Sequence, residues 1–262
     1  MAATVKRILK IVGLVIVLLL VVAAALIAPA FLGRRSMPDG LEVNGIRMVR
    51  DGFVGVAVVP AGEREVVLID AGNDSAGTAV LAELSNRRLG PEAVSTIFIT
   101  HGHPDHIAGI AAFAKAQVMA LAAEAPLIEG RVAARGPLPR LFGASPTGVR
   151  VARPLQDGET VTVGPTQIQV FSVPGHTAGS AAYLVNGVLF LGDAADAGRD
   201  GALKGAPWIF SDSQDEDRAS LVRLGQRLEK EGAVVKAIVF AHSGALTEGL
   251  TPLMTFAQNN RQ

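Results

Sequence analysis

Three of the chain's five histidines stand close together, in the run His101-Gly102-His103-Pro104-Asp105-His106. The other two, His176 and His242, each follow a predicted strand, and so does Asp193. Imidazole nitrogens and carboxylate oxygens together suit borderline divalent metals, chiefly Zn²⁺, with Mn²⁺ or Fe²⁺ as alternatives. Four such side chains on one short loop cannot all reach one tetrahedral ion without strain. We therefore expect two ions, about 3.5–4 Å apart, with further ligands supplied from elsewhere in the chain.

The histidine run is placed by the elements on either side of it. It comes directly after the uncharged, β-branched stretch 94–100, which predicts a buried strand, and before a predicted helix. A loop at the carboxyl end of a buried strand is held rigidly while its side chains project outward. The run therefore lies where a functional site is expected.

The rest of the body alternates clusters of strands with helices, in two halves. Asp51-Gly52 and Asn186-Gly187 are hairpin dipeptides, and Ser213-Gln214-Asp215-Glu216 is a capping box that begins a helix. This order predicts two packed sheets with helices outside, a four-layer α/β domain. Strands are expected at 42–49, 53–59, 66–69, 160–163, 167–173, 181–185, 188–191 and 236–240, helices at 75–88, 213–230 and 251–258, a helix, short strand and helix within 107–125, and a loop or lid over 126–156.

This set of motifs resembles the metallo-β-lactamase fold superfamily. That family has an Asp after an early strand, H-x-H-x-D-H, a later His, a later Asp and a final His. The matching positions here are Asp70, the 101–106 run, His176, Asp193 and His242, in the same order, and the resemblance spans residues 41–250. It implies an αββα sandwich.

The resemblance also implies a role for each of these residues. One ion would be held by His101, His103 and His176, and the second by Asp105, His106 and His242. Asp193 would bridge the two ions, and Asp70 would orient the metal loop by hydrogen bonds. Asp105 is the expected catalytic residue, which steers the attacking water or moves its proton.

The Gly-Asp pattern at 192–193 resembles glyoxalase II-like thioesterases and lactonases. True β-lactamases of this fold generally carry Cys or Ser where Asp193 stands. We therefore expect a dinuclear metallohydrolase that acts on an ester, a thioester or a lactone. The alternatives are a β-lactamase of the same fold, a metal or redox module without hydrolytic activity, and a membrane-tethered scaffold with a relict site.

The N-terminal stretch 11–33 carries no charge and consists mainly of Val, Leu, Ile and Ala. As a helix it would rise about 34 Å, enough to cross a hydrocarbon core of roughly 30 Å. We expect a single-pass membrane anchor and linker at 1–37 and a hydrolase domain at 38–262. A signal peptide cleaved near Ala28-Pro29-Ala30 and a buried core helix are the alternatives. The short basic tail favours a body on the extracytoplasmic side, anchored or, after cleavage, secreted.

Composition excludes several classes of protein. Residues 38–262 hold 19 basic and 24 acidic residues, which argues against nucleic acid as a partner. The chain has no cysteine, so disulfides, thiolate metal sites, iron–sulfur clusters and a Cys nucleophile are ruled out. It also has no Gly-x-Ser-x-Gly motif. A small-molecule substrate is expected, and the composition does not predict an oligomeric state.

Overall fold

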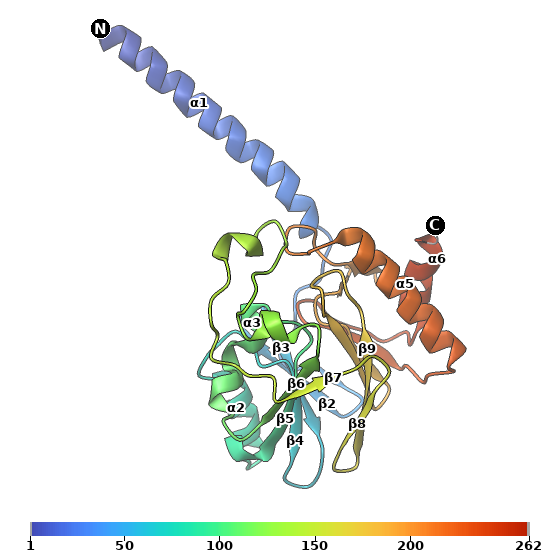
Figure 1. Cartoon of the computed structure of the whole chain (residues 1–262). Helices are drawn as coiled ribbons and strands as arrows, with labels where there is room; N and C mark the ends of the chain where they lie inside the picture. The colour runs from blue at the N-terminus through green and yellow to red at the C-terminus, as the bar shows by residue number, and fades with distance from the viewer. Residues whose placement is uncertain (1, 261–262) are drawn as a thin grey trace. The chain divides into compact units, whose positions relative to one another are not determined.

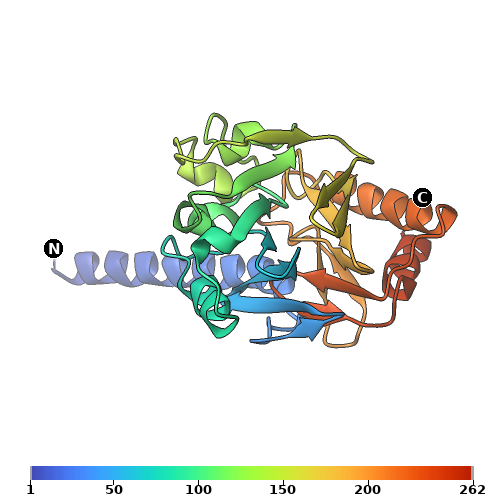
Figure 2. The same ribbon diagram turned by 90° about the horizontal axis from the view of Figure 1, so that it is seen from below.

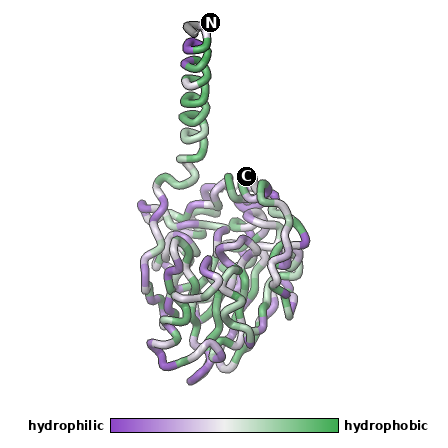
Figure 3. Tube along the Cα trace, turned by 90° about the vertical axis from the view of Figure 1, so that its left-hand side faces the viewer, coloured by the Kyte–Doolittle hydropathy of each residue, from purple (hydrophilic) through white to green (hydrophobic). Residues whose placement is uncertain are grey.

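The computed structural model describes residues 2–260 and divides into two compact units, one ending at Gly33 and one beginning at Arg34. The first unit holds helix α1 (Ala2–Ile27) and the short 3-10 helix η1 (Ala28–Ala30). Residues Thr4–Ile27 contain an 18-residue window with a mean hydropathy of 3.0 and are long enough to cross a membrane. Figure 3 shows the apolar colouring along most of the helix. The helix ends before the predicted limit at residue 33, because Pro29 cannot continue it.

In the second unit, the first sheet has seven strands in the order β1-β2-β3-β4-β5-β6-β7. Neighbours from β1 to β4 are antiparallel, and neighbours from β4 to β7 are parallel. Because β4 and β5 run in the same direction, the residues that follow them emerge at one edge of the sheet. The strands are β1 (Glu42–Val43), β2 (Ile46–Asp51), β3 (Val54–Pro60), β4 (Val66–Ile69), β5 (Val94–Phe98), β6 (Gln117–Leu121) and β7 (Arg153–Leu155).

The second sheet has six strands in the order β15-β14-β11-β10-β9-β8, with a parallel pair only between β11 and β14. Asn186 and Gly187 join β10 to β11 with φ angles of 50° and 79°, as a type I′ turn requires. The strands are β8 (Thr160–Val163), β9 (Thr166–Ser172), β10 (Ala181–Val185), β11 (Val188–Phe190), β14 (Ala237–Phe240) and β15 (Gly244–Leu246); β12 (Ala195–Ala197) and β13 (Leu203–Gly205) form a separate pair.

Helices cover the outer faces of both sheets (Figure 1). Phe98 and Tyr183 belong to the apolar core between the sheets, Leu84 of α2 belongs to the core outside the first sheet, and Leu221 of α5 to the core outside the second. Figure 2 shows α5 and α6, in orange and red, on the side of the body opposite to α2. The predicted four-layer sandwich is therefore confirmed. The helices are α2 (Thr78–Asn86), α3 (Pro104–Ile107), α4 (Ala125–Ile128), α5 (Gln214–Lys230) and α6 (Thr251–Asn259), with short 3-10 helices η2 (Pro91–Ala93), η3 (Ala108–Ala112) and η4 (Pro139–Phe142).

Several local predictions were wrong. The single strand expected at 42–49 is two strands, because Asn44 and Gly45 have φ angles of 50° and 80° and make a turn. The stretch 126–156, expected to be a loop, contains η4, β7 and most of α4. Strands β12, β13 and β15 were not predicted, since three residues offer too little alternation to reveal a strand.

Candidate metal centre

The histidine run lies on the loop between β5 and α3, where the chain leaves the first sheet. Pro104 begins α3, so the side chains of residues 105 and 106 project from its first turn. His101, His103 and His106 are all buried. The remaining predicted ligands come from the second sheet, since His176 follows β9, Asp193 follows β11 and His242 follows β14.

Three histidines form one triangle of nitrogen atoms. His101 Nε2 lies 3.0 Å from His103 Nδ1 and 3.2 Å from His176 Nε2, and the last two atoms are 3.1 Å apart. Ligand atoms that are bonded to one tetrahedral zinc ion stand about 3.4 Å from one another. The triangle therefore has the size of one face of a metal coordination sphere.

Asp105, His106 and His242 form a second group beside the first. Asp105 Oδ2 lies 3.6 Å from His106 Nε2 and 3.4 Å from His242 Nε2. The Asp193 carboxylate lies between the groups: it is 3.1 Å from His242 Nε2 and 3.4 Å from His106 Nε2 on one side, and 3.7 Å from His176 Nε2 on the other. One carboxylate is thus within reach of both groups.

Four of the five histidines are held through Nδ1 by an oxygen atom. Asp70 Oδ2 lies 2.8 Å from Nδ1 of His106, and the backbone oxygen of Phe53 lies 2.9 Å from Nδ1 of His242. Thr100 Oγ1 donates a hydrogen bond to Asp70 and lies 3.1 Å from Nδ1 of His101. Because the hydroxyl proton is already donated, this oxygen accepts a hydrogen bond from the Nδ1–H of His101.

Ser211 makes the equivalent arrangement for His176, the fourth of these histidines. Its hydroxyl donates a hydrogen bond to the carbonyl of Pro207 at 2.8 Å and lies 3.1 Å from Nδ1 of His176, so its oxygen accepts a hydrogen bond from Nδ1–H. Each held imidazole then presents the lone pair of Nε2 to the centre. Carboxylate and hydroxyl partners of this kind fix the tautomer of metal-binding histidines.

Burial and charge set the protonation of these groups. Burial lowers the pKa of His101 and His176 well below the ordinary histidine value, and the neighbouring imidazoles add to that effect. Burial also opposes protonation of His106, but the surrounding carboxylates raise its pKa well above the ordinary value. Burial works against ionisation of Asp193, but His242 and His106 lower the pKa of its carboxyl group well below the usual range.

The donor set fits divalent metal ions. His106 Nε2 and Asp193 Oδ1 are buried, and neither makes a hydrogen bond with any residue that the structure describes. Leaving such atoms without a partner is costly, and a cation between them would satisfy both. All ligand atoms within each group lie within 4.8 Å of one another. The nitrogen and oxygen donors match the preference of Zn²⁺, Mn²⁺ and Fe²⁺.

The structure brings together all seven predicted ligands and Asp70 in one place. Thr100 and Ser211 were missed in the sequence. Thr100 stands directly before the histidine run and could have been noted for that reason. Ser211 lies 35 residues from the histidine that it contacts, and the residues around it carry no pattern that points to a metal centre.

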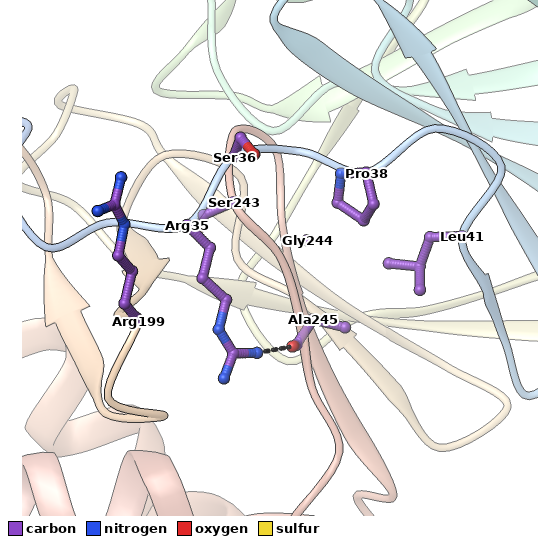
Figure 4. Close-up of a pocket in the computed structure, with 8 residues that line it drawn as sticks. All are labelled: Arg35, Ser36, Pro38, Leu41, Arg199, Ser243, Gly244 and Ala245. Carbon is purple, nitrogen blue, oxygen red and sulfur yellow. Dashed lines mark hydrogen bonds between the residues drawn. The ribbon is translucent and has the colours of Figure 1, made fainter.

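A separate pocket of about 500 Å³ contains none of the predicted ligands. Arg35 lies along it and donates a hydrogen bond to the carbonyl of Ala245, shown dashed in Figure 4. Ser243, which directly follows His242 in the chain, also lines this pocket. The pocket is lined by Arg35, Ser36, Pro38, Leu41, Arg199, Ser243, Gly244 and Ala245.

Comparison with known proteins points to one family. The profile of the Metallo-beta-lactamase superfamily matches residues 50–242. The hydroxyacylglutathione hydrolase of Idiomarina loihiensis is 27% identical over 174 residues, which is 66% of this chain and 58% of that protein. The hydroxyacylglutathione hydrolase of Shewanella oneidensis is 33% identical over 171 residues, which is 64% of this chain and 57% of that protein. The chain thus spans less than three fifths of these curated relatives.

Solved structures show the same fold. The metallo-β-lactamase MIM-1 from Novosphingobium pentaromativorans is 25% identical, with a TM-score of 0.63 over 87% of this chain and 88% of that chain. A B3 metallo-β-lactamase described as having an active-site glutamic acid is 22% identical, with a TM-score of 0.62 over 88% of both chains. The architecture is therefore shared with β-lactamases, while the curated relatives carry the name of a thioester hydrolase.

Proposed function

Because the chain belongs to the metallo-β-lactamase superfamily, we propose that its two groups of histidines and carboxylates form a dinuclear centre, of zinc by preference, that hydrolyses thioesters, esters or lactones. The observation that carries the proposal is the position of Asp193. Its carboxylate lies within 3.1–3.7 Å of histidines from both groups. A single carboxylate in that position is suited to bridge two ions.

The ligands divide between the ions as the two groups do. His101, His103 and His176 would hold one ion, the side chains of the second group would hold the other, and Asp193 would contact both. Divalent ions supply Lewis acidity, which makes water nucleophilic at neutral pH and polarises a carbonyl group. Asp70 fixes the orientation of His106, so its role is to keep the second group aligned.

The open side of the centre lies at the second group. The side chains of Asp105 and His242 are 19% and 27% exposed, whereas that of His106 is fully buried. Phe53 stacks on His242 with ring centroids 5.6 Å apart and is itself largely exposed. Substrate would therefore approach past Asp105, whose carboxylate would orient the attacking water and accept its proton.

Asp193 also bears on the class of substrate. A carboxylate at the middle of the centre reduces its net positive charge. The centre then stabilises a departing amide nitrogen less well. Alkoxide and thiolate leaving groups need less help than an amine. The names of the curated relatives support the thioester alternative. The fold of the structural neighbours supports a second candidate, a β-lactamase.

Parallel kinetics on a thioester, a lactone and a β-lactam test the proposal. We expect kcat/KM for the better of the first two to exceed that for the β-lactam at least about tenfold, or roughly 1.4 kcal/mol of transition-state stabilisation. Elemental analysis of active protein should find two divalent ions per chain. The variant His101→Ala should lose activity while keeping the circular dichroism spectrum of the parent. Preferred turnover of a penicillin, or one ion per active chain, would contradict the proposal.

We further propose that α1 anchors the chain in a membrane, with the body on the extracytoplasmic side. The support is the length and hydropathy of Thr4–Ile27. The full chain should stay in the membrane pellet after an alkaline carbonate wash and keep residues 1–10 attached. A soluble form beginning near Phe31 would instead establish signal cleavage. Protease added outside the membrane of intact cells should cut the body, and complete protection would place it in the cytoplasm.

A further inference from the structure

Glu124 is a buried carboxylate outside the ligand set, only 1% exposed, in the turn between β6 and α4. Its Oε1 accepts a hydrogen bond from the backbone N–H of Gly102 at 2.8 Å. Its Oε2 accepts another from the backbone N–H of Gly179, also at 2.8 Å. Gly102 stands between His101 and His103, and Gly179 stands three residues after His176. One side chain therefore ties together the two loops that carry the first group of histidines.

Those two loops belong to different sheets. His101 and His103 follow β5 of the first sheet, and His176 follows β9 of the second. The nitrogen triangle, with sides of 3.0–3.2 Å, thus depends on how the loops of two sheets are held against each other. A small displacement of one loop against the other would change the distances between the nitrogen atoms that would bind the ion.

Gly179 and Gly102 lie closer to the backbone of Glu124 and of Ile128 than a residue with a side chain could. A Cβ atom added at Gly179 would lie 2.3 Å from the backbone nitrogen of Glu124, and one added at Gly102 would lie 2.8 Å from that of Ile128. Only glycine permits these contacts. The glycines on both loops therefore let the carboxylate reach both amides at once.

We propose that Glu124 is a positioning residue for the metal centre, which sets the separation of the His101–His103 loop and the His176 loop and so the affinity for the first ion. The inference rests on the proposed metal centre but not on any particular substrate. A carboxylate is required because it accepts through both oxygens, whereas the amide of Gln has one accepting oxygen and one donating NH₂ group. Gln would keep the volume and lose one of the two hydrogen bonds.

The Glu124→Gln variant therefore distinguishes a positioning role of the carboxylate from a role in filling space. The test compares zinc affinity of the full-length parent with that of Glu124→Gln and Glu124→Ala, by competition against a chromophoric chelator. We expect the zinc Kd to rise about 10–100-fold in both variants, the range found when partners of metal ligands are removed. The visible spectrum of the Co²⁺-loaded protein should also change. In both variants the two sheets stay joined by another hydrogen bond, in which the backbone N–H of Ala181 donates to the carbonyl of Thr100 at 2.8 Å.

Glu159→Gln is the matched control. The Glu159 carboxylate also accepts through both oxygens, from the backbone N–H of Gln156 at 3.0 Å and from the guanidinium of Arg153, and neither partner lies in a loop that carries a predicted site residue. It should lose thermal stability while keeping the parent's zinc Kd and Co²⁺ spectrum.

The outcomes distinguish this inference from the proposed function. Parent-like zinc affinity in Glu124→Gln would overturn the positioning role. So would a rise in Kd that tracks the loss of thermal stability in both Glu124→Gln and Glu159→Gln. A parent that binds no zinc would overturn both the centre and the role of Glu124. A parent that binds zinc but hydrolyses no thioester, ester or lactone would overturn the function alone. If Glu124→Ala does not fold, the near-isosteric Gln variant decides.

Discussion

At the scale of single residues, the chemistry of the centre depends on oxygen atoms that no metal would touch. The hydroxyl groups of Thr100 and Ser211 each donate a hydrogen bond, Thr100 to Asp70 and Ser211 to the carbonyl of Pro207. Because each hydroxyl has donated its own proton, its oxygen accepts the Nδ1–H of a histidine. The tautomers of His101 and His176 are thus determined before any ion binds, which removes part of the cost of ordering the site.

Ser211→Ala tests that arrangement. Without the hydroxyl, His176 Nδ1 loses its buried partner and the ring is no longer held in one tautomer. We expect zinc affinity to fall about tenfold or more, measured by chelator competition. Ser213→Ala, two residues further on, is the control: it removes the hydroxyl that accepts from Glu216 N–H at the start of α5. That variant should lose about 1 kcal/mol of stability and keep the parent's affinity. The reverse pattern would show that Ser211 serves only the fold.

The proposed ligands themselves could be predicted because four of them share one short run and the rest follow recognisable strands. Glu124 and Ser211 could not. Their partners are 22 to 55 residues away, and what they contact is backbone or a single ring nitrogen. No local spacing records such contacts, because they arise only when the two sheets pack against each other.

At the scale of elements, each proposed ligand lies in a segment that follows the carboxyl end of a strand. Strands with several alternating or uninterrupted apolar residues, such as β4 (66–69) and β10 (181–185), were predicted with the bounds that the structure shows. The Asn186-Gly187 turn was also predicted, since both residues must adopt positive φ. Strands β12, β13 and β15 could not be predicted, because pairing stabilises them rather than their own sequence: β15 pairs with β14, and β12 with β13.

Helix α5 carries a buried acid that makes stability depend on pH. Burial raises the pKa of Asp217 to about 7, although the N–H of Ala206 donates to its carboxylate. The folded-state pKa is raised above the unfolded value near 3.8, so this contribution to stability is fully present below pH 4 and is lost as pH rises through about 7. Because asparagine does not ionise, the Asp217→Asn variant should not show this loss of stability at higher pH.

We therefore expect the Tm of Asp217→Asn, relative to the parent, to increase by several degrees between pH 5 and pH 8. Thermal melts of both metal-free proteins at four pH values measure it, and the titrations of all other groups cancel in the difference. A difference in Tm that stays constant across this range would mean that Asp217 has an ordinary pKa in the folded protein.

At the scale of the whole molecule, the body begins earlier than the linker composition indicates. The boundary was predicted between residues 37 and 38, whereas the second compact unit begins at Arg34. Arg34 forms an ion pair with Asp196, and the N–H of Arg35 donates to the carbonyl of Ala197 at 2.9 Å. Met37 is 3% exposed and belongs to the core between the sheets. Residues 34–37 thus complete the body rather than merely precede it.

This arrangement predicts a difference between two soluble chains, one beginning at Arg34 and one at Pro38. The shorter chain loses the Met37 side chain from the core, which costs about 2–5 kcal/mol, and leaves Asp196 buried without its guanidinium partner, which adds to that cost. Since 1 kcal/mol shifts the midpoint of a domain of this size by about 2–4 °C, its Tm should be lower by roughly 10 °C in scanning calorimetry at equal zinc concentration. The full-length double variant Arg34→Ala/Met37→Ala should reproduce most of the shift, because it removes the side chains and keeps the backbone bond to Ala197. Equal midpoints for the two chains would show that the body needs nothing before Pro38, and that the contacts of Arg34 and Met37 contribute no net stability.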